Sequence, residues 1–438
     1  MTSPRLPTLR AASNSKPTST TPGARLHETA PGAAREGRAH LRPRGSSQGG
    51  LGQYNERVVL QAVRLHTAVP SADIARLTGL TAQTVSMITK RLLDDGYLLK
   101  GEPQRGKVGQ PSVPLLLNPD GAYSIGIKVG RRQLDTLLID FTGRPRARWS
   151  LAYGFPDPDT VLAEIRQRFA AIRRKLGPDG RARVEGVGLA APLGLSGWQS
   201  LLGIAPDVAE RWGRLDLREA VAALSDWPVD SMKDTAAACV AELVAGQGRG
   251  LRSFLYIFVD TFIGGGLVVD SHLRVGITGN AGAIGSMPLG VAKGDGAGVV
   301  PQLLSVASLH SLERAWADAG LPALGTDSPQ VLDAPWRDVT QAWLRRASLA
   351  IAHTVNSAAC LLDIDGVIID GTVAPPLLAA LIAAVDDATR RYNWEGVTMP
   401  HVMPGTIGAD AAALGGALLP LHANYAPDRD LFLKGIAT

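Results

Sequence analysis

Three consecutive glycines, Gly264-Gly265-Gly266, form the first stretch whose residue types could do chemistry. The triplet separates two apolar runs, residues 255–259 and 267–269, so the pattern predicts a β-hairpin with the glycines in its turn. A turn without side chains lets backbone N–H groups approach a phosphate or a sugar, because glycine lacks a Cβ and tolerates positive φ. A tight turn that binds nothing is the simpler alternative for so short a motif.

A second glycine-rich segment, residues 279–287 (GNAGAIGSM), follows the triplet. With it, the chain resembles the ROK family of sugar kinases and sugar-responsive repressors, in which a phosphate hairpin precedes a segment close to AGEIGH. The family's glutamate and histidine, which hold sugar hydroxyls, fall here on Ala283 and Ser286. The resemblance implies an effector site that includes Gly265, Gly282 and Ser286 but lacks two polar ligands.

Asp234 is a second candidate for chemistry, within the segment 231–237 (SMKDTAA). An aspartate at a strand-to-helix junction is a good N-cap for the helix expected over residues 235–245. The resemblance also aligns Asp234 with the kinase base that deprotonates a sugar hydroxyl, and Lys233 with an asparagine of the family. Both roles can coexist, and we expect Asp234 and Lys233 to contact the effector without catalysis.

The kinases of this family need a phosphate loop close to DxGGT directly after the first strand of the domain. The equivalent positions here are Lys128-Val129-Gly130-Arg131-Arg132. The carboxylate that would hold magnesium is missing, so phosphoryl transfer loses its main electrostatic support, although the two arginines could bind phosphate themselves. We therefore expect an inactive kinase-like domain with no catalytic residue and no cofactor.

The zinc site of the family uses the histidine of AGEIGH and three cysteines in a CxCGxxGC segment. Here the histidine is Ser286, and residues 290–301 (GVAKGDGAGVVP) contain no cysteine, so we expect no metal. A sugar-binding glutamate that follows those cysteines falls near Gln302 or Leu304, and the sequence leaves open which.

Two further cleft contacts follow from the resemblance. Residues 190–194 (AAPLG) match the turn after the third strand and imply a contact by Gly194. Residues 204–207 (IAPD) resemble the segment whose asparagine touches the sugar, with Asp207 in its place. Trp212 comes next in the chain. It is either a core aromatic or a surface on which a sugar stacks.

Residues 53–118 predict three short helices and a β-hairpin. The second helix is expected to begin with Ser71 as its N-cap, to direct Leu77 inward and to end at Gly79. Thr81 caps the third helix, in which apolar residues recur at helical spacing. Strands over residues 97–100 and 113–117 would flank a glycine-rich loop.

A short helix, a glycine turn and a polar third helix predict a winged helix-turn-helix that places the third helix in the major groove of DNA. The loop over residues 101–112 would reach phosphates or the adjacent minor groove. The residues expected to contact DNA are Thr81, Gln83, Thr84, Ser86, Lys90, Arg91, Arg105, Lys107 and Gln110. A small helical bundle with a solvated polar face is the alternative. This segment also resembles the N-terminal winged helix of the ROK repressors.

Basic charge is concentrated toward the N-terminus. Residues 1–50 hold 8 Lys and Arg against 2 Asp and Glu, residues 51–119 hold 8 against 5, and the remainder holds 29 against 33. This distribution indicates that the N-terminal part faces a polyanion. Residues 1–50 have no hydrophobic periodicity, so we expect a disordered basic arm that adds phosphate contacts or reflects an over-long start assignment.

The rest of the composition favours a cytoplasmic protein. No apolar run is long enough to span a membrane, and the N-terminal residues lack the apolar region of a secretory signal. Cys239 and Cys360 lie far apart in apolar surroundings, which indicates reduced thiols.

The fold class we expect is α/β: an N-terminal winged helix-turn-helix over residues 51–119, then a two-lobed actin-like domain of the sugar-kinase and ROK type over residues 120–438. The lobes would comprise residues 120–240 with the C-terminal helix, and residues 241–405. The expected function is a transcriptional regulator, a repressor, bound to a double-stranded DNA operator as a homodimer or homotetramer. Its effector would be a sugar, a sugar phosphate or a sugar acid. The alternatives are a sugar kinase with an attached DNA-binding module, and a DNA-binding protein with an inert cleft.

Overall fold

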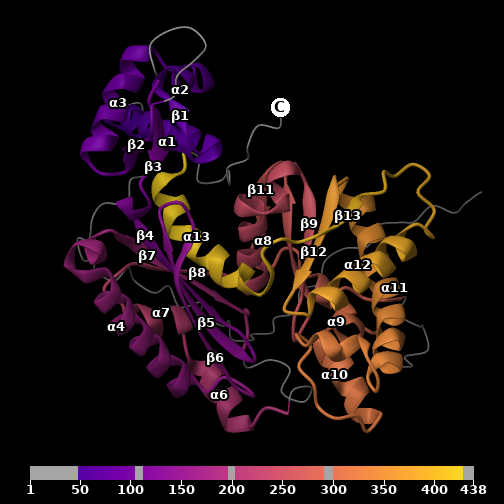
Figure 1. The fold of residues 1–438 in the computed structure, drawn as a ribbon. Helices are drawn as coiled ribbons and strands as arrows, with labels where there is room; N and C mark the ends of the chain where they lie inside the picture. The colour runs from indigo at the N-terminus through magenta and orange to yellow at the C-terminus, as the bar shows by residue number, and fades with distance from the viewer. Residues whose placement is uncertain (1–47, 104–111, 196–202, 291–298, 428–438) are drawn as a thin grey trace, which may run out of the picture. The chain divides into compact units, whose positions relative to one another are not determined.

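The computed structural model describes residues 48–103, 112–195, 203–290 and 299–427 (Figure 1). Three of the residues expected to contact DNA, Arg105, Lys107 and Gln110, lie outside this description. The expected basic arm also lies outside it, except that the first helix begins within that stretch, at Gln48. In the described part of the chain, no helix has the length and apolarity needed to cross a membrane.

The N-terminal module contains three helices and a small antiparallel sheet. The helices are α1 (Gln48–His66), α2 (Ser71–Thr78) and α3 (Ala82–Asp94). The strands are β1 (Val69–Pro70), β2 (Leu98–Lys100) and β3 (Pro114–Leu117), in the order β1-β3-β2. Thr81 caps α3 as expected, since its side chain accepts a hydrogen bond from the Thr84 N–H at 3.2 Å. The hairpin of β2 and β3 is present, and β1 was not predicted.

Two details of α2 differ from the expectation. The residue before the helix is Pro70, so Ser71 is its first residue and not its N-cap. Leu77 is 42% exposed, while Ile74 is fully buried. Residues three apart lie roughly 60° apart around a helix, so Leu77 lies at the edge of the face that buries Ile74. Gly79 ends the helix in the left-handed conformation at φ +69°.

The remaining described residues form two lobes built on five-stranded sheets with the same strand order. The first sheet runs β6 (Pro145–Ala152), β5 (Gln133–Asp140), β4 (Tyr123–Val129), β7 (Val184–Ala191) and β8 (Val229–Lys233). The second runs β11 (His272–Arg274), β10 (Gly264–Val269), β9 (Phe254–Val259), β12 (Gly366–Gly371) and β13 (His401–Pro404). In each sheet the first three strands are antiparallel and the next two pairings are parallel. The duplicated α/β pattern expected from the sequence is therefore observed, with β6 as an additional strand.

Helices cover these sheets. The helices of the first lobe are α4 (Pro158–Ala182), α6 (Pro206–Arg214) and α7 (Leu217–Ala222), with the short η1 (Pro119–Gly121) before β4. Those of the second are α9 (Leu303–Ala307), α10 (Leu309–Asp318), α11 (Arg337–Leu362) and α12 (Pro375–Thr389), with η2 (Gln247–Gly250), η3 (Ile284–Ser286) and η4 (Pro329–Leu332). Both α8 (Asp234–Ala245) and α13 (Ala411–Tyr425), which follows η5 (Gly408–Asp410), contribute to the core shared with the N-terminal module.

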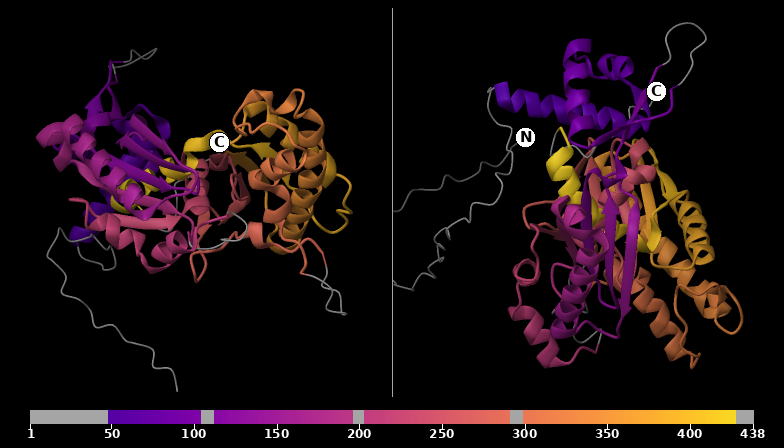
Figure 2. Two further views of the ribbon diagram at one scale, coloured as in Figure 1. Left: turned by 90° about the horizontal axis from the view of Figure 1, so that it is seen from below. Right: turned by 60° about the vertical axis from the view of Figure 1, so that its left-hand side comes forward.

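The helix α13 returns from the second lobe and packs against β4, β7 and α8 of the first (Figure 2). Small residues allow this close approach. A Cβ placed on Gly415 would lie 1.7 Å from the carbonyl oxygen of Ala237, and one on Gly188 would lie 1.8 Å from the carbonyl oxygen of Gly416. Glycine at these positions is thus required for the contact between α13, α8 and the first sheet.

The glycine triplet lies inside β10 and not in the turn, which corrects the expectation from the sequence. Its residues pair with β9, and the turn is formed by residues 260–263. Packing explains the glycines. A Cβ on Gly266 would lie 2.5 Å from the Cβ of Cys239 in α8, and one on Gly265 would lie 2.6 Å from the backbone oxygen of Tyr256. The absent side chains allow α8 to press against the strand.

Candidate effector cleft and DNA-binding surface

The end of β4 is joined to the end of β9 by a partly buried ion pair. The Lys128 Nζ donates to the Asp260 Oδ2 at 3.2 Å, and Lys128 is only 3% exposed. Burial disfavours the ammonium, but Asp260 and Asp135 outweigh this effect and raise the pKa of Lys128. Burial likewise opposes the charge on Asp260, yet Lys128 and hydrogen bonds lower the pKa of that carboxyl. The two groups are therefore both ionised at neutral pH.

The next two cations of the same loop also reach the second lobe. The Arg131 guanidinium lies over the ring of Phe262, 4.7 Å from its centroid. Burial lowers the pKa of Arg131, and the charges of Asp234 and Asp260 oppose that change. Arg132 pairs with Glu313 of α10. Lys128, Arg131, Arg132, Asp260 and Glu313 line a cavity of about 380 Å3.

Asp234 stands beside these charges at the first position of α8. The residue before the helix is Lys233, so Asp234 begins the helix and does not precede it as an N-cap. Its Oδ1 accepts a hydrogen bond from the Thr235 N–H at 2.8 Å. Burial raises the pKa of Asp234, against the opposing effects of Arg131, the Thr235 N–H and Lys128. A carboxylate in this setting is ready to gain a polar ligand.

A larger cavity of about 600 Å3 opens on the other side of Lys233. It is lined by Gly194, Trp212, Asp216, Arg218, Ser231, Lys233 and Gly279, together with apolar side chains. The Lys233 Nζ donates to the Asn280 Oδ1 at 2.9 Å, and burial lowers the pKa of Lys233. Trp212 is buried and its Nε1 donates to the Pro156 carbonyl at 2.7 Å. Trp212 is therefore both a core aromatic and a wall of the cavity.

Other residues expected at the effector site lie apart from these cavities. Asp207 is exposed in the first turn of α6 and does not line the 600 Å3 cavity. Gly265 is buried within β10, and Gly282, at φ +72°, packs against that strand. Ser286 ends η3 and is exposed. The structure thus joins Gly194 and Lys233 at one cavity, with Asp234 adjacent, and does not bring the other four residues to it.

The two positions left open by the sequence differ in burial. Leu304 is buried in the core of the second lobe. Gln302 is the residue that precedes α9, and it is half-buried. Only the latter keeps a polar side chain at the surface. Across the described ranges, no group of three or more His, Cys, Asp or Glu side chains could hold a metal ion.

The exposed face of α3 carries Gln83, Ser86, Met87 and Lys90. Val85, Ile88 and Leu92 are buried on the opposite face, as their spacing predicts. Thr81 and Thr84 share a hydrogen bond of 2.8 Å between their hydroxyls. Arg91 pairs with Glu56 of α1 at 2.8 Å and with Asp95 at 3.6 Å. Gln83, Ser86, Met87 and Lys90 are therefore the side chains of this face that are most available to a ligand.

Comparison with known proteins identifies the larger part of the chain. Residues 124–423 match the model described as the ROK family. The chain belongs to the ROK family. The putative xylose repressor of Caldicellulosiruptor sp. (strain Rt8B.4) is 23% identical over 68% of this chain and 75% of its own length. The xylose repressor of Bacillus subtilis (strain 168) is also 23% identical, over 54% of this chain and 61% of its own length.

A solved structure gives the same fold. The ROK family transcriptional regulator described as a homolog of the Escherichia coli MLC protein superposes with a TM-score of 0.61. It is 21% identical and covers 86% of this chain and 97% of its own. The expected α/β fold of the ROK domain is thereby confirmed.

Sequence reasoning missed four residues of this ROK protein. Asn280 lies in the glycine-rich segment already singled out, and Asp260 follows directly after an apolar strand, so both carried a local signal. Arg218 lines the 600 Å3 cavity from α7 without a recognisable motif. Met87 is 64% exposed on α3, off the apolar stripe, which is a signal that helical spacing alone could have given.

Aromatic packing joins the N-terminal module to the ROK domain. The rings of Tyr97, Phe141 and Tyr425 meet with centroid separations of 5.7, 5.5 and 4.7 Å. Arg57 of α1 donates to the Ala426 carbonyl at 3.5 Å. Because Tyr425 ends α13, and α13 packs on α8, the packing is continuous from the module to the helix that begins with Asp234.

Proposed function

We propose that this chain is a DNA-binding transcriptional repressor that responds to a sugar or a sugar-derived effector. One observation carries the proposal: a three-helix module with a polar outward face on α3 precedes a ROK domain whose cleft has charged groups unsuited to phosphoryl transfer. The names of the two relatives, both xylose repressors, support the same reading.

We assign residues 51–119 to a winged helix-turn-helix. In this assignment α2, Gly79 and α3 form the helix-turn-helix, and β2 and β3 form the wing. The N-terminal half of α3 would enter the major groove, with Gln83 and Ser86 at base edges and Lys90 at a phosphate. Arg91 would reach phosphate by leaving Glu56, and the wing would add Arg105, Lys107 and Gln110.

The domain over residues 120–438 would bind its effector without phosphorylating it. A ROK kinase holds magnesium and phosphate with a carboxylate and a glycine-rich backbone at the first loop. Here the loop presents Lys128, whose charge is matched by Asp260, in place of the free carboxylate that would hold magnesium. The second candidate function, a sugar kinase with an attached DNA-binding module, requires that this pair separate.

The effector would occupy the 600 Å3 cavity lined by Gly194 and Lys233, with Asp234 next to Lys233 in the chain. Lys233 and Arg218 suit an anionic group, while Asp216, Asn280 and Asp234 suit hydroxyls. This set of groups favours a sugar phosphate or a sugar acid over a neutral sugar. Asp207 and Ser286 would contribute only after the lobes move.

Effector binding would act on DNA through linkage. An effector that binds the DNA-incompetent arrangement about a hundredfold more tightly supplies roughly 2.7 kcal/mol of coupling. The packed path through α8 and α13 to the aromatic cluster gives the two sites a physical connection. The repressor would act in the cytoplasm as a homodimer or homotetramer, because paired modules read paired half-sites.

Fluorescence anisotropy with DNA from upstream of the protein's own gene tests the proposal. The titration is made at stated salt, without and with a panel of neutral sugars, sugar phosphates and sugar acids. We expect tight binding that one class of compound releases. Binding that no compound alters would contradict the sensing role, and magnesium-dependent ADP formation with any hexose would favour the kinase.

A further inference from the structure

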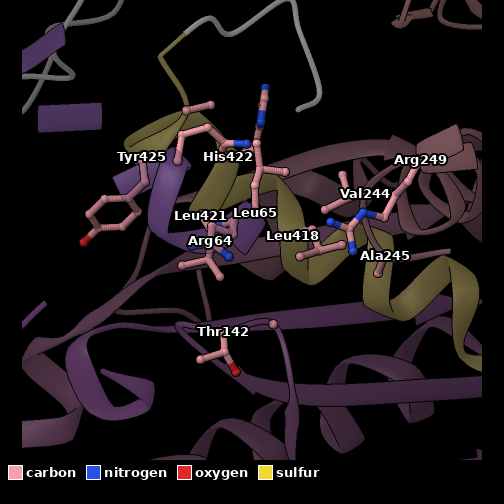
Figure 3. A pocket seen from close by; sticks show the side chains of 13 residues that line it. Arg64, Leu65, Thr142, Val244, Ala245, Arg249, Leu418, Leu421, His422 and Tyr425 are labelled. Atoms are coloured by element: carbon pink, nitrogen blue, oxygen red, sulfur yellow. The ribbon is translucent and has the colours of Figure 1, made fainter. Parts of the chain in front are cut away.

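A second cavity, of about 200 Å3, lies away from the cleft at the contact between the N-terminal module and the ROK domain (Figure 3). Its walls come from α1, the turn between β5 and β6, the end of α8, η2 and α13. None of the residues that line it also lines the 600 Å3 cavity. A ligand here would therefore touch both parts of the protein at once without entering the cleft.

The first polar group of this junction cavity is the guanidinium of Arg64. It lies 5.1 Å from the centroid of the Phe141 ring, and within the described chain it has no carboxylate at ion-pair distance. Burial lowers the pKa of Arg64 to about 10, with Tyr425 and Asp140 opposing the change, so the side chain stays cationic at neutral pH. A half-buried cation without a close counter-charge favours an anion as its partner.

Two further donors face the same space. Gln61 is 7% exposed, and its Nε2 has no hydrogen-bond partner among the described residues. An unpaired buried amide is unfavourable, and an acceptor atom of a ligand would supply the missing hydrogen bond. Arg249 of η2 supplies a second, exposed guanidinium. Among the described residues that line the cavity there is no Asp or Glu to compete with an anion for these donors.

The rest of the wall is mostly apolar. Leu65, Val244, Leu418 and Leu421 line the cavity beside the ring of Tyr425 (Figure 3). Such a surface favours a ligand with an apolar body as well as a charged group. A bare inorganic anion would leave this surface uncovered.

We propose that the junction cavity is a second ligand site, which binds a small organic anion with its acidic group between Arg64 and Arg249 and its apolar part against α13. The binding itself is independent of the proposed function, whereas its effect on DNA rests on it. Because the ligand contacts α1 and α13 together, it stabilises the arrangement in which the module is docked on the ROK domain, and it shifts DNA affinity by its preference for that arrangement.

Calorimetry on the full chain tests the site with three probes: benzoate, its neutral counterpart benzamide, and inorganic phosphate. We expect benzoate to bind at least tenfold more tightly than benzamide, and phosphate to bind more weakly than benzoate. Equal affinity for benzoate and benzamide would overturn the anion site. Binding of phosphate as tight as that of benzoate would overturn the apolar half of the proposal.

Matched variants locate the binding. Arg249→Gln removes an exposed guanidinium and is expected to weaken benzoate at least tenfold, while Arg390→Gln, on the distant α12 surface beside Asp386, leaves it unchanged. Arg64→Gln should also weaken benzoate binding at least tenfold. If Arg64→Gln fails to fold, Arg249→Gln alone still tests the site. Unchanged benzoate affinity in Arg249→Gln would overturn the site. Binding seen only after removal of residues 428–438 would assign the cavity to that segment instead.

Two controls separate this site from the cleft and from the proposed function. Asp234→Asn, in the cleft, should bind benzoate as the wild type does, and loss of binding there would place the ligand in the cleft and overturn the proposal. Benzoate should also change the affinity for operator DNA by at least threefold in anisotropy. Benzoate binding with no operator binding at all would overturn the proposed function and leave the anion site standing.

Discussion

Lys128 and Asp260 face each other across the cleft, with Nζ and Oδ2 3.2 Å apart, and so join strands of two different lobes. The residues are 132 positions apart in the chain. Lys128 belongs to the loop that we align with the phosphate loop of the family's kinases. The charges of this pair therefore hold the two lobes together.

Replacing Lys128 by Met is expected to lower the free energy of unfolding by about 2 kcal/mol, because Asp260 would keep a poorly solvated charge without its partner. Urea denaturation at pH 7 measures the change. Lys175→Met, on the exposed surface of α4, is the matched control and should stay within about 0.5 kcal/mol of the wild type. Equal stability of both variants would mean that the pair contributes nothing.

The pH at which the protein loses stability in acid should also change in Lys128→Met. The pKa of Asp260 is lowered in the folded chain, so its contribution is present above the unfolded value of about 3.9 and is lost as the pH falls through the lower folded value. Without Lys128, only the hydrogen bonds from Thr372 and the Thr261 N–H would oppose the effect of burial, so the pKa of Asp260 would be higher than in the wild type. Unfolding curves between pH 3 and 7 should therefore show Lys128→Met losing stability at a higher pH than the wild type.

Asp234→Asn should separate binding from folding. Burial raises the pKa of Asp234, so stability is fullest below about pH 3.9 and falls as the pH rises through the folded value. Asparagine removes that charge and keeps the acceptor for the Thr235 N–H. The melting temperature should be unchanged or higher, operator binding intact and effector release lost. A variant that loses operator binding as well would indicate a folding role.

Lys90→Ala should weaken operator binding and reduce the slope of log K against log salt by about 0.9, the value for one phosphate contact. Lys175→Ala should change neither. Gln83→Ala and Met87→Ala should instead relax base preference, measured by competition with single-base operator variants. If none of the three α3 variants differs from the control, the exposed face of α3 is not the DNA-binding surface.

Gly415→Ala tests the contact of α13 with α8. The added methyl would meet the backbone of Ala237, so we expect destabilisation by about 3 kcal/mol together with weaker coupling between effector and DNA. Gly52→Ala is the matched control, since nothing lies within 4 Å of its Cβ position in the exposed first turns of α1. That change should stabilise the chain by roughly 1 kcal/mol through helix propensity. Thermal denaturation of both variants distinguishes the steric clash of the added methyl group from the effect of alanine's helix propensity.

Much of the fold follows from local patterns. The apolar runs predicted β4 and β9, the spacing of Val85, Ile88 and Leu92 predicted the buried face of α3, and Thr81 predicted where that helix begins. These features depend on neighbours within one or two turns. They could therefore be derived without knowing what packs against them.

The errors come from contacts between distant residues. The glycine triplet was expected in a turn because glycine favours turns, but Cys239 of α8 is what excludes a side chain at Gly266. The ion pair between Lys128 and Asp260 had no local pattern that could join its members. Asp207 and Ser286 were expected in the cleft by alignment to a family, and alignment does not specify how far apart the lobes stand.

The return of α13 to the first lobe orders events during synthesis of the chain. Arg57 and Ala426, which meet at 3.5 Å, are 369 residues apart, so this contact forms only after almost the whole ROK domain has been made. The helices and strands of the N-terminal module pack mainly on one another and can form early. The faces of the module, β4 and β7 that α13 covers stay exposed until α13 has been made. A chain truncated before residue 411 would therefore present a folded N-terminal module attached to a ROK domain that lacks α13 and is prone to aggregate.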